Sequence, residues 1–97
     1  MYRHISIFTL KDKDKINDFI ALLKEVGDKA PSVVHCEVGK NFGKAPIGPG
    51  PDFGDVIQIL DFETMEDLNA WPATPEHIYL MKEGPENEKV TALDYEV

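Results

Sequence analysis

Histidine and tryptophan side chains carry most of the chemical capacity of this chain of 97 residues. His77 lies in the segment W-P-A-T-P-E-H-I-Y-L, where Thr74 and Pro75 predict a helix start, because threonine caps helices and proline fits the first helical position. His77 therefore falls in the first helical turn, where the partial positive charge of the helix N-terminus favours the neutral imidazole. A neutral imidazole accepts a proton near pH 7, so His77 is the first candidate for a general base.

Four further side chains are candidates for chemistry beside His77. His4 lies on the first predicted strand, and we expect it to share the site. Trp71 is interpreted as a packing wall or as a platform that stacks on a substrate. Cys36 lies in mid-strand and reads as an inert small hydrophobe rather than a nucleophile. His35 should face away from the other histidines, and the chain has no H-x-H, H-E-x-x-H or C-x-x-C spacing, so no metal site is predicted.

The elements that must position these residues follow from the hydrophobic pattern. Runs of β-branched and aromatic residues predict strands over residues 2–10, 33–40, 55–62 and 88–97. Apolar residues at helical spacing predict a helix that Asp14 caps and Gly27 ends, a short helix from Thr64 to Trp71, and a third helix over residues 75–82. On the second strand, simple alternation places one set of residues on one face, Val34, Cys36 and Val38, and another set on the opposite face, Val33, His35 and Glu37.

Residues 41–54 predict a long loop, because glycine and proline dominate them. Their glycines match neither G-x-x-x-x-G-K-[ST] nor a G-x-G-x-x-G that joins a strand to a helix. We therefore interpret the loop as a lid or an assembly element, and we predict no nucleotide or other cofactor.

The order of elements predicts an α+β, ferredoxin-like fold, with a split β-α-β repeat, a four-stranded antiparallel sheet and the helices on one face, as a single domain over residues 1–97. This arrangement leaves the second sheet face apolar, which a soluble monomer rarely tolerates. We therefore expect a homodimer in which two sheets stack into a barrel-like core. The expected interface residues are Ile5, Ile7, Ile57, Ile59, Leu93, Tyr95 and Val97.

Composition excludes several partners. The net charge is −8 and no cluster of lysine and arginine stands out, which argues against nucleic acid and anionic membrane surfaces. One cysteine cannot form an internal disulfide, and no apolar run has the length of a signal peptide or a membrane span, so we expect a cytoplasmic protein.

The fold predicts a pocket between the sheet and the helices. Its walls should be mostly apolar with a few polar groups, the usual composition of a small-molecule site. His77 and His4 are the candidate catalytic residues. The expected lining is Ser6, Phe8, Phe19, Leu23, Cys36, Gln58, Leu60, Trp71 and Ala92.

Several segments in order resemble the stress-responsive dimeric α/β-barrel (Dabb) family. They are R-H-I-S-I-F-T-L-K at the start, E-V-G after the second strand, D-F-E-T-x-E-x-L, the P-x-H that ends at His77, and A-L-D-Y-E-V at the end. The resemblance implies a ferredoxin-like homodimer. One plant branch of the family contains a polyketide cyclase, in which this histidine is the base and a tyrosine six residues earlier assists it. Trp71 occupies that tyrosine position here, and an indole has no acidic hydroxyl.

Three functions are therefore compatible with the sequence. The first is the binding, or conversion, of a small apolar carbonyl compound in the pocket, with His77 moving a proton. The second is a non-catalytic structural dimer associated with stress. The third is a cofactor-independent enzyme that resembles a cyclase or a monooxygenase, by analogy of fold. An enclosed cavity with both histidines in its wall would favour the first over the second.

Overall fold

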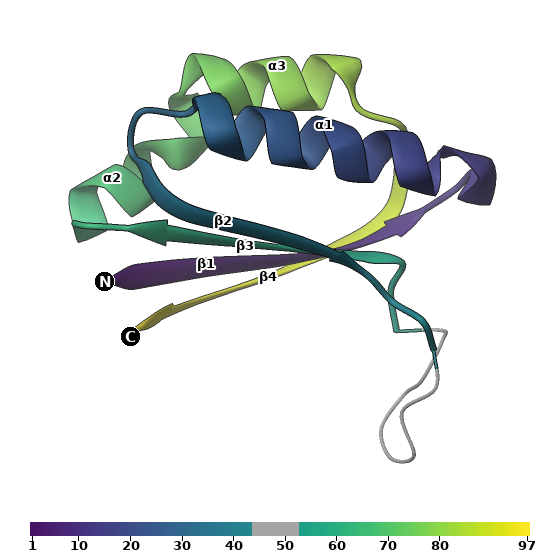
Figure 1. The fold of residues 1–97 in the computed structure, drawn as a ribbon, viewed down its shortest axis with the longest axis horizontal. Helices are drawn as coiled ribbons and strands as arrows, with labels where there is room; N and C mark the ends of the chain where they lie inside the picture. Colours follow the sequence, from purple (N-terminus) through teal and green to yellow (C-terminus); the bar gives the residue numbers. More distant parts are fainter. Residues whose placement is uncertain (44–52) are drawn as a thin grey trace.

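The computed structural model describes residues 1–43 and 53–97 and follows the predicted order of elements. Figure 1 shows a four-stranded sheet with the long helices on one side of it. The elements are β1 (Tyr2–Leu10), α1 (Ile16–Lys29), β2 (Val33–Lys40), β3 (Val56–Phe62), α2 (Met65–Ala70), α3 (Pro75–Glu83) and β4 (Asn87–Glu96), with 3₁₀ turns at Lys13–Lys15 and Trp71–Ala73.

The sheet has the strand order β2-β3-β1-β4, and every neighbouring pair is antiparallel. The central strand β1 pairs with β3 on one side and with β4 on the other, so the two halves of the chain interleave. Helices α1 and α3 lie side by side over the same face (Figure 1). This is the predicted ferredoxin-like, antiparallel α+β fold.

Helix α1 differs from its prediction at both ends. Its apolar stripe is buried as expected, through Phe19, Leu23 and Val26. The residue before α1 is Lys15, which makes no side-chain capping bond, whereas Asp12 caps the short 3₁₀ turn ahead of the helix by accepting the Asp14 backbone N–H. At the other end the helix runs past Gly27 to Lys29.

Gly27 lies within α1 because the helix passes very close to β2 at this point. A Cβ atom there would lie 2.2 Å from Cys36 Sγ and 2.8 Å from Cys36 Cβ. The expectation that Gly27 ends the helix was therefore wrong, and the glycine serves the packing of a helix on a strand.

Strand β2 contains a bulge that changes which residues face the helices. Val33 pairs with Phe62 and His35 pairs with Asp61, so Val34 is the extra residue. Val33 consequently packs against the core beside Cys36 and Val38, while Val34 is exposed. Simple alternation had placed Val34 inward and Val33 outward, and the bulge reverses both.

The core lies between the helices and the inner sheet face. Fully buried side chains come from β1, α1 and β3, and Trp71 adds a large aromatic ring near the start of α3. The buried cluster comprises Phe8, Leu10, Phe19, Leu23, Val26, Ala30, Val56, Leu60, Phe62, Trp71 and Leu80.

The outer sheet face is apolar and open, as predicted. Four isoleucines of β1 and β3 are half-buried, and the large side chains at the end of β4 are exposed. They are Ile5, Ile7, Ile57, Ile59, Leu93, Tyr95 and Val97.

One ion pair, which the pattern did not suggest, lies at the edge of this apolar area. Arg3 Nε and Nη2 donate to the two carboxylate oxygens of Asp61 at 2.7 and 2.9 Å. The hydrogen bonds from Arg3 lower the pKa of Asp61. His35 pairs with Asp61 across the strands and faces this side, away from the other histidines as expected.

The described ends of the predicted 41–54 loop are tied together. Asn41 Nδ2 donates to the Gly54 carbonyl oxygen at 2.8 Å, and the Asp55 carboxylate accepts from the Leu10 N–H and from Lys13 Nζ. The predicted role of the loop as a lid or an assembly element depends on residues 44–52, which lie outside the described residues. Across residues 1–43 and 53–97, no helix is long and apolar enough to cross a membrane.

Candidate functional site

A cavity of about 350 Å³ lies between α3 and the strands β1 and β4. It follows the length of α3, from Trp71 and His77 at one end to Gly84 and Asn87 at the other. The structure brings eight of the predicted site residues together in its wall: His4, Ser6, Phe8, Phe19, Gln58, Trp71, His77 and Ala92.

His4 is held between two polar partners. Its Nδ1 lies 2.5 Å from Asp94 Oδ1, and its Nε2 lies 3.0 Å from Ser6 Oγ. A carboxylate can only accept a hydrogen bond, so His4 Nδ1 carries the hydrogen and Nε2 is the acceptor for the Ser6 hydroxyl. Asp94, His4 and Ser6 thus form a chain along which a proton can move between the cavity and the edge of the sheet.

His77 is placed by the helix start that the sequence predicts. The Thr74 hydroxyl accepts the His77 backbone N–H at 3.3 Å, and Pro75 occupies the first turn. The ring lies edge-on to Trp71, with 5.5 Å between the ring centres.

The pKa of His77 is lowered, as expected, but the dominant cause differs from the expected one. Burial contributes most, and the neighbouring His4 also lowers the pKa. A hydrogen bond to the Pro72 backbone acts in the opposite direction, and because proline has no N–H, the ring must donate to the Pro72 carbonyl. A neutral imidazole that donates through one nitrogen keeps the other as a proton acceptor.

Trp71 closes this end of the cavity as a packing wall. It is buried and also touches Phe62, with ring centres 5.9 Å apart. The indole therefore fixes the position of His77 and lines the cavity at the same time.

Three predicted lining residues lie elsewhere in the fold. Leu23 and Leu60 are fully buried under α1, and Cys36 packs against Gly27. Burial raises the pKa of the Cys36 thiol, which keeps it protonated and unreactive, in agreement with the reading of Cys36 as a small hydrophobe. Gln58 does reach the cavity, but its side-chain N–H donates to the Leu23 carbonyl oxygen at 3.2 Å.

Sequence reasoning missed two polar residues of the site, Asp94 and Asn87. Asp94 comes opposite His4 in the pairing of β1 with β4. Leu93 and Tyr95 were expected on the outer face, so alternation along β4 puts Asp94 on the helix side. An antiparallel pairing of the first and last strands would then have brought Asp94 to His4. Asn87 could not be found in this way, because its orientation depends on a bulge.

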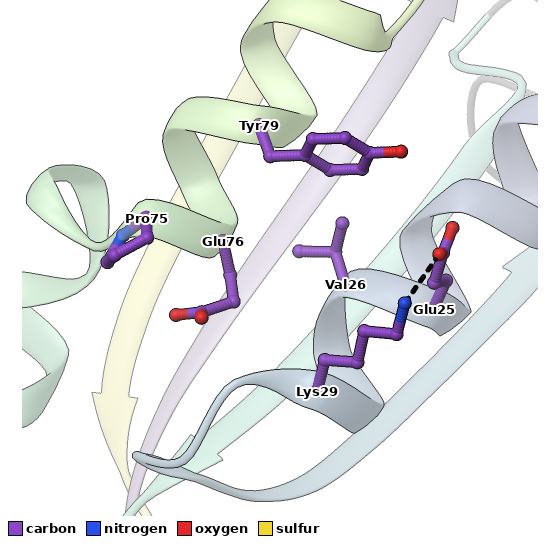
Figure 2. A pocket seen from close by; sticks show the side chains of 6 residues that line it. All are labelled: Glu25, Val26, Lys29, Pro75, Glu76 and Tyr79. Carbon is purple, nitrogen blue, oxygen red and sulfur yellow. Dashed lines mark hydrogen bonds and ion pairs between the residues drawn. The ribbon is translucent and has the colours of Figure 1, made fainter.

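A second hollow, of about 320 Å³, lies between α1 and α3 on the outside of the molecule. Figure 2 shows Tyr79 of α3 extending over Val26 of α1. It also shows Lys29 and Glu25, both of α1, joined by an ion pair. Tyr79 is exposed here, and because it follows His77 by two residues it lies roughly 200° around the helix from it. The charged groups at this hollow are paired or at its rim, so the histidine-lined cavity is the better candidate.

No metal centre is indicated by the side chains that the structure describes, since nowhere do three His, Cys, Asp or Glu residues group as ligands. The acid and base groups in the cavity wall are the side chains of His4, Ser6 and His77.

The fold and the cavity define a ferredoxin-like α+β protein with a pocket between sheet and helix. Residues 2–97 match the family described as the stress responsive A/B barrel domain (Dabb), and the chain belongs to that family. The resemblance noted in the sequence is thereby confirmed. Curated proteins give no significant match.

Solved structures of this fold are similar over nearly the whole chain. A dimeric ferredoxin-like protein of unknown function from Thermobifida fusca has a TM-score of 0.78 and 19% identity, and the match covers 99% of this chain and 90% of that one. A Dabb family protein from Mesorhizobium loti has a TM-score of 0.78 and 21% identity, with 99% and 95% covered. A hydroxynitrile lyase from Passiflora edulis has a TM-score of 0.78 and 23% identity, with 97% and 90% covered. At these identities the likeness establishes the fold alone.

Proposed function

We propose that this protein is a homodimer that binds a small, largely apolar carbonyl compound in the cavity under α3 and moves a proton on it. The observation that carries the proposal is the cavity itself, with His4 and His77 both in its wall. Packed side chains without a void would have favoured the purely structural dimer. The volume falls in the range of about 300–1,000 Å³ that is usual for small-molecule sites.

His77 is the proposed base. Its lowered pKa keeps the imidazole neutral at pH 7, and the hydrogen bond to Pro72 orients one nitrogen away from the reacting group. The remaining nitrogen can take a proton from a carbon next to a carbonyl group.

Ser6 and His4 are the proposed partners of the carbonyl oxygen. When negative charge develops on that oxygen, the Ser6 hydroxyl can turn from His4 Nε2 and donate its hydrogen bond to the oxygen instead. The Asp94 carboxylate accepts from His4 Nδ1 and so fixes the orientation of the His4 ring beside Ser6. Proton removal at one end and hydrogen bonding at the other together favour enolisation.

Trp71 sets a limit on the reaction. An indole N–H can donate a hydrogen bond but cannot act as the acid that a tyrosine hydroxyl provides. We therefore rank binding with proton transfer above a cyclase reaction that needs two acid–base groups at this end. A hydroxynitrile lyase has the same fold, so this scaffold can support catalysis.

The homodimer part of the proposal rests on the open sheet face. Isoleucine side chains of β1 and β3 and exposed residues of β4 form one apolar area, and proteins with this fold are described as dimeric. When two such faces come into contact, each Å² of apolar area removed from water contributes about 25 cal/mol to the stability of the dimer. Arg3 and Asp61 would then meet the second copy as an already satisfied ion pair.

A thermal-shift screen against small ketones and aldehydes tests the ligand site. We expect His77→Ala to abolish the rise in melting temperature that a bound compound gives, because the base and part of the cavity wall are lost. The melting temperature without ligand should change little, since His77 is only partly buried.

The matched control is His35→Ala, which removes a histidine from the opposite sheet face and should leave the shift intact. A ligand-induced shift that survives in His77→Ala would remove His77 from the site.

A further inference from the structure

The far end of the cavity is shaped by an irregularity in β4. Phe8 pairs with Val90 and Thr9 with Lys89, but Leu10 pairs with Asn87, so the register shifts between Thr9 and Leu10. Glu88 is therefore an extra residue on β4, which is a β-bulge.

The bulge decides which side chain enters the cavity. Val90, Ala92 and Asp94 lie opposite Phe8, Ser6 and His4 and share the helix side of the sheet. Regular alternation would continue this face with Glu88 and turn Asn87 to the outer face. Because of the extra residue, Asn87 takes the place opposite Leu10 and lines the cavity instead.

Asn87 brings an unused hydrogen-bond acceptor into this position. Its Oδ1 atom is buried and has no hydrogen-bond partner among the residues that the structure describes. A buried acceptor without a partner is uncommon in native proteins and calls for an explanation. A ligand that donates a hydrogen bond at this end of the cavity provides one.

The middle of the cavity separates the two polar ends. Between Ser6 and Asn87, the side chains of Phe8, Phe19, Leu80 and Val90 line the cavity and offer apolar contacts. Asn87 lies opposite Leu10, six positions along β1 from His4, which corresponds to about 20 Å of strand. Ser6, the proposed partner of the carbonyl oxygen, lies four positions from Leu10, or about 13 Å of strand, and a hydrogen bond of about 2.8 Å at each end leaves a free span of roughly 8 Å.

We propose that Asn87 is a specificity-determining residue that accepts a hydrogen bond from a hydroxyl group at the distal end of the ligand. The ligand class is then a medium-length ω-hydroxy ketone, with the carbonyl at His4 and His77, an apolar chain beside Phe8 and Ala92, and a hydroxyl at Asn87. This inference rests on the proposed function, since it assigns the second end of the same site.

Three probe compounds with the same number of heavy atoms separate the possibilities. They are 8-hydroxyoctan-2-one, nonan-2-one and 7-methoxyheptan-2-one, and calorimetric titration of the whole protein gives their affinities. We expect the hydroxy ketone to bind wild-type protein at least ten-fold more tightly than the other two. The hydroxyl can donate to Asn87 Oδ1, whereas a methyl group or an ether oxygen cannot.

Two variants locate the preference. Asn87→Leu has nearly the same shape without the acceptor, so nonan-2-one should bind it at least as well as the hydroxy ketone. Asn87→Asp keeps an acceptor and should keep the preference. The comparison of the three compounds on wild-type protein is decisive even if Asn87→Leu does not fold.

The failures of the two proposals differ. Equal affinities for the three ketones in wild-type protein, all lowered by His77→Ala, would overturn the role of Asn87 and leave the proposed function in place. Affinities that His77→Ala leaves unchanged, or no binding of any ketone to wild-type protein, would overturn both.

Discussion

At the scale of single residues, the two cavity histidines are held in different ways. His4 has both ring nitrogens engaged, by Asp94 and Ser6, so it acts through the Ser6 hydroxyl. His77 is fixed by Pro72 and Trp71 and keeps one nitrogen as an acceptor. One histidine is thus suited to relay a proton, and the other is suited to accept one directly.

The lowered pKa of His77 predicts a pH effect with a definite sign. Its pKa in the folded protein lies below the ordinary value of about 6.5, so the unfolded chain binds the proton more readily. The contribution of His77 to stability is therefore fully present above about pH 6.5 and is lost as the pH falls toward the folded-state pKa.

An NMR titration of the His77 ring protons measures this directly. We expect a midpoint below about 6.5, which moves up in His4→Ala because the electrostatic effect by which His4 lowers the pKa of His77 is removed. A midpoint at or above the ordinary value would contradict both the burial of the ring and its role as a neutral base.

At the scale of elements, the sequence predicted strands and helices well where local periodicity determines them. β1 and β2 were placed from runs of β-branched and aromatic residues, and the helix start at Thr74 was placed from its capping residue and Pro75. Asp61 lies on the open face that the same alternation defines, but a pattern of apolar residues does not show that Arg3 lies beside it.

The missed features depend on contacts between elements that are distant in sequence. The bulge at Val34 and the bulge at Glu88 exist only in relation to β3 and β1, and each turns neighbouring side chains to the other face. Gly27 looks like a helix stop by local rules, but its packing against Cys36 overrides them. The pair of Asp94 and His4 joins residues 90 positions apart.

At the scale of the whole molecule, the helices cover one sheet face (Figure 1). The side chains on the other face leave an apolar surface. The cavity opens between α3 and the sheet, on the helix side, so assembly through the outer face leaves it in each subunit. The proposed ligand site and the proposed dimer interface therefore lie on opposite faces of the same sheet, and each can be tested without removing the other.

Light scattering at micromolar concentration tests the assembly. We expect wild-type protein to have twice the chain mass, and Ile59→Glu to be monomeric, because a charge would enter the centre of the apolar face. Ile78→Glu is the matched control, since Ile78 is exposed on α3, and it should stay dimeric. A monomeric wild-type protein would disprove stacking of the sheets.

The central claim, that a small ketone binds in the cavity under α3, is tested most directly by methyl NMR during a titration with nonan-2-one. This compound lacks the distal hydroxyl, so the result does not depend on Asn87. The account predicts saturable shifts of the methyl signals of Leu80, Met81 and Ala92, which line the cavity, and little change at Leu23. Saturable shifts at Leu23 with none at Leu80 and Ala92, or no saturable shift at any methyl group, would contradict it.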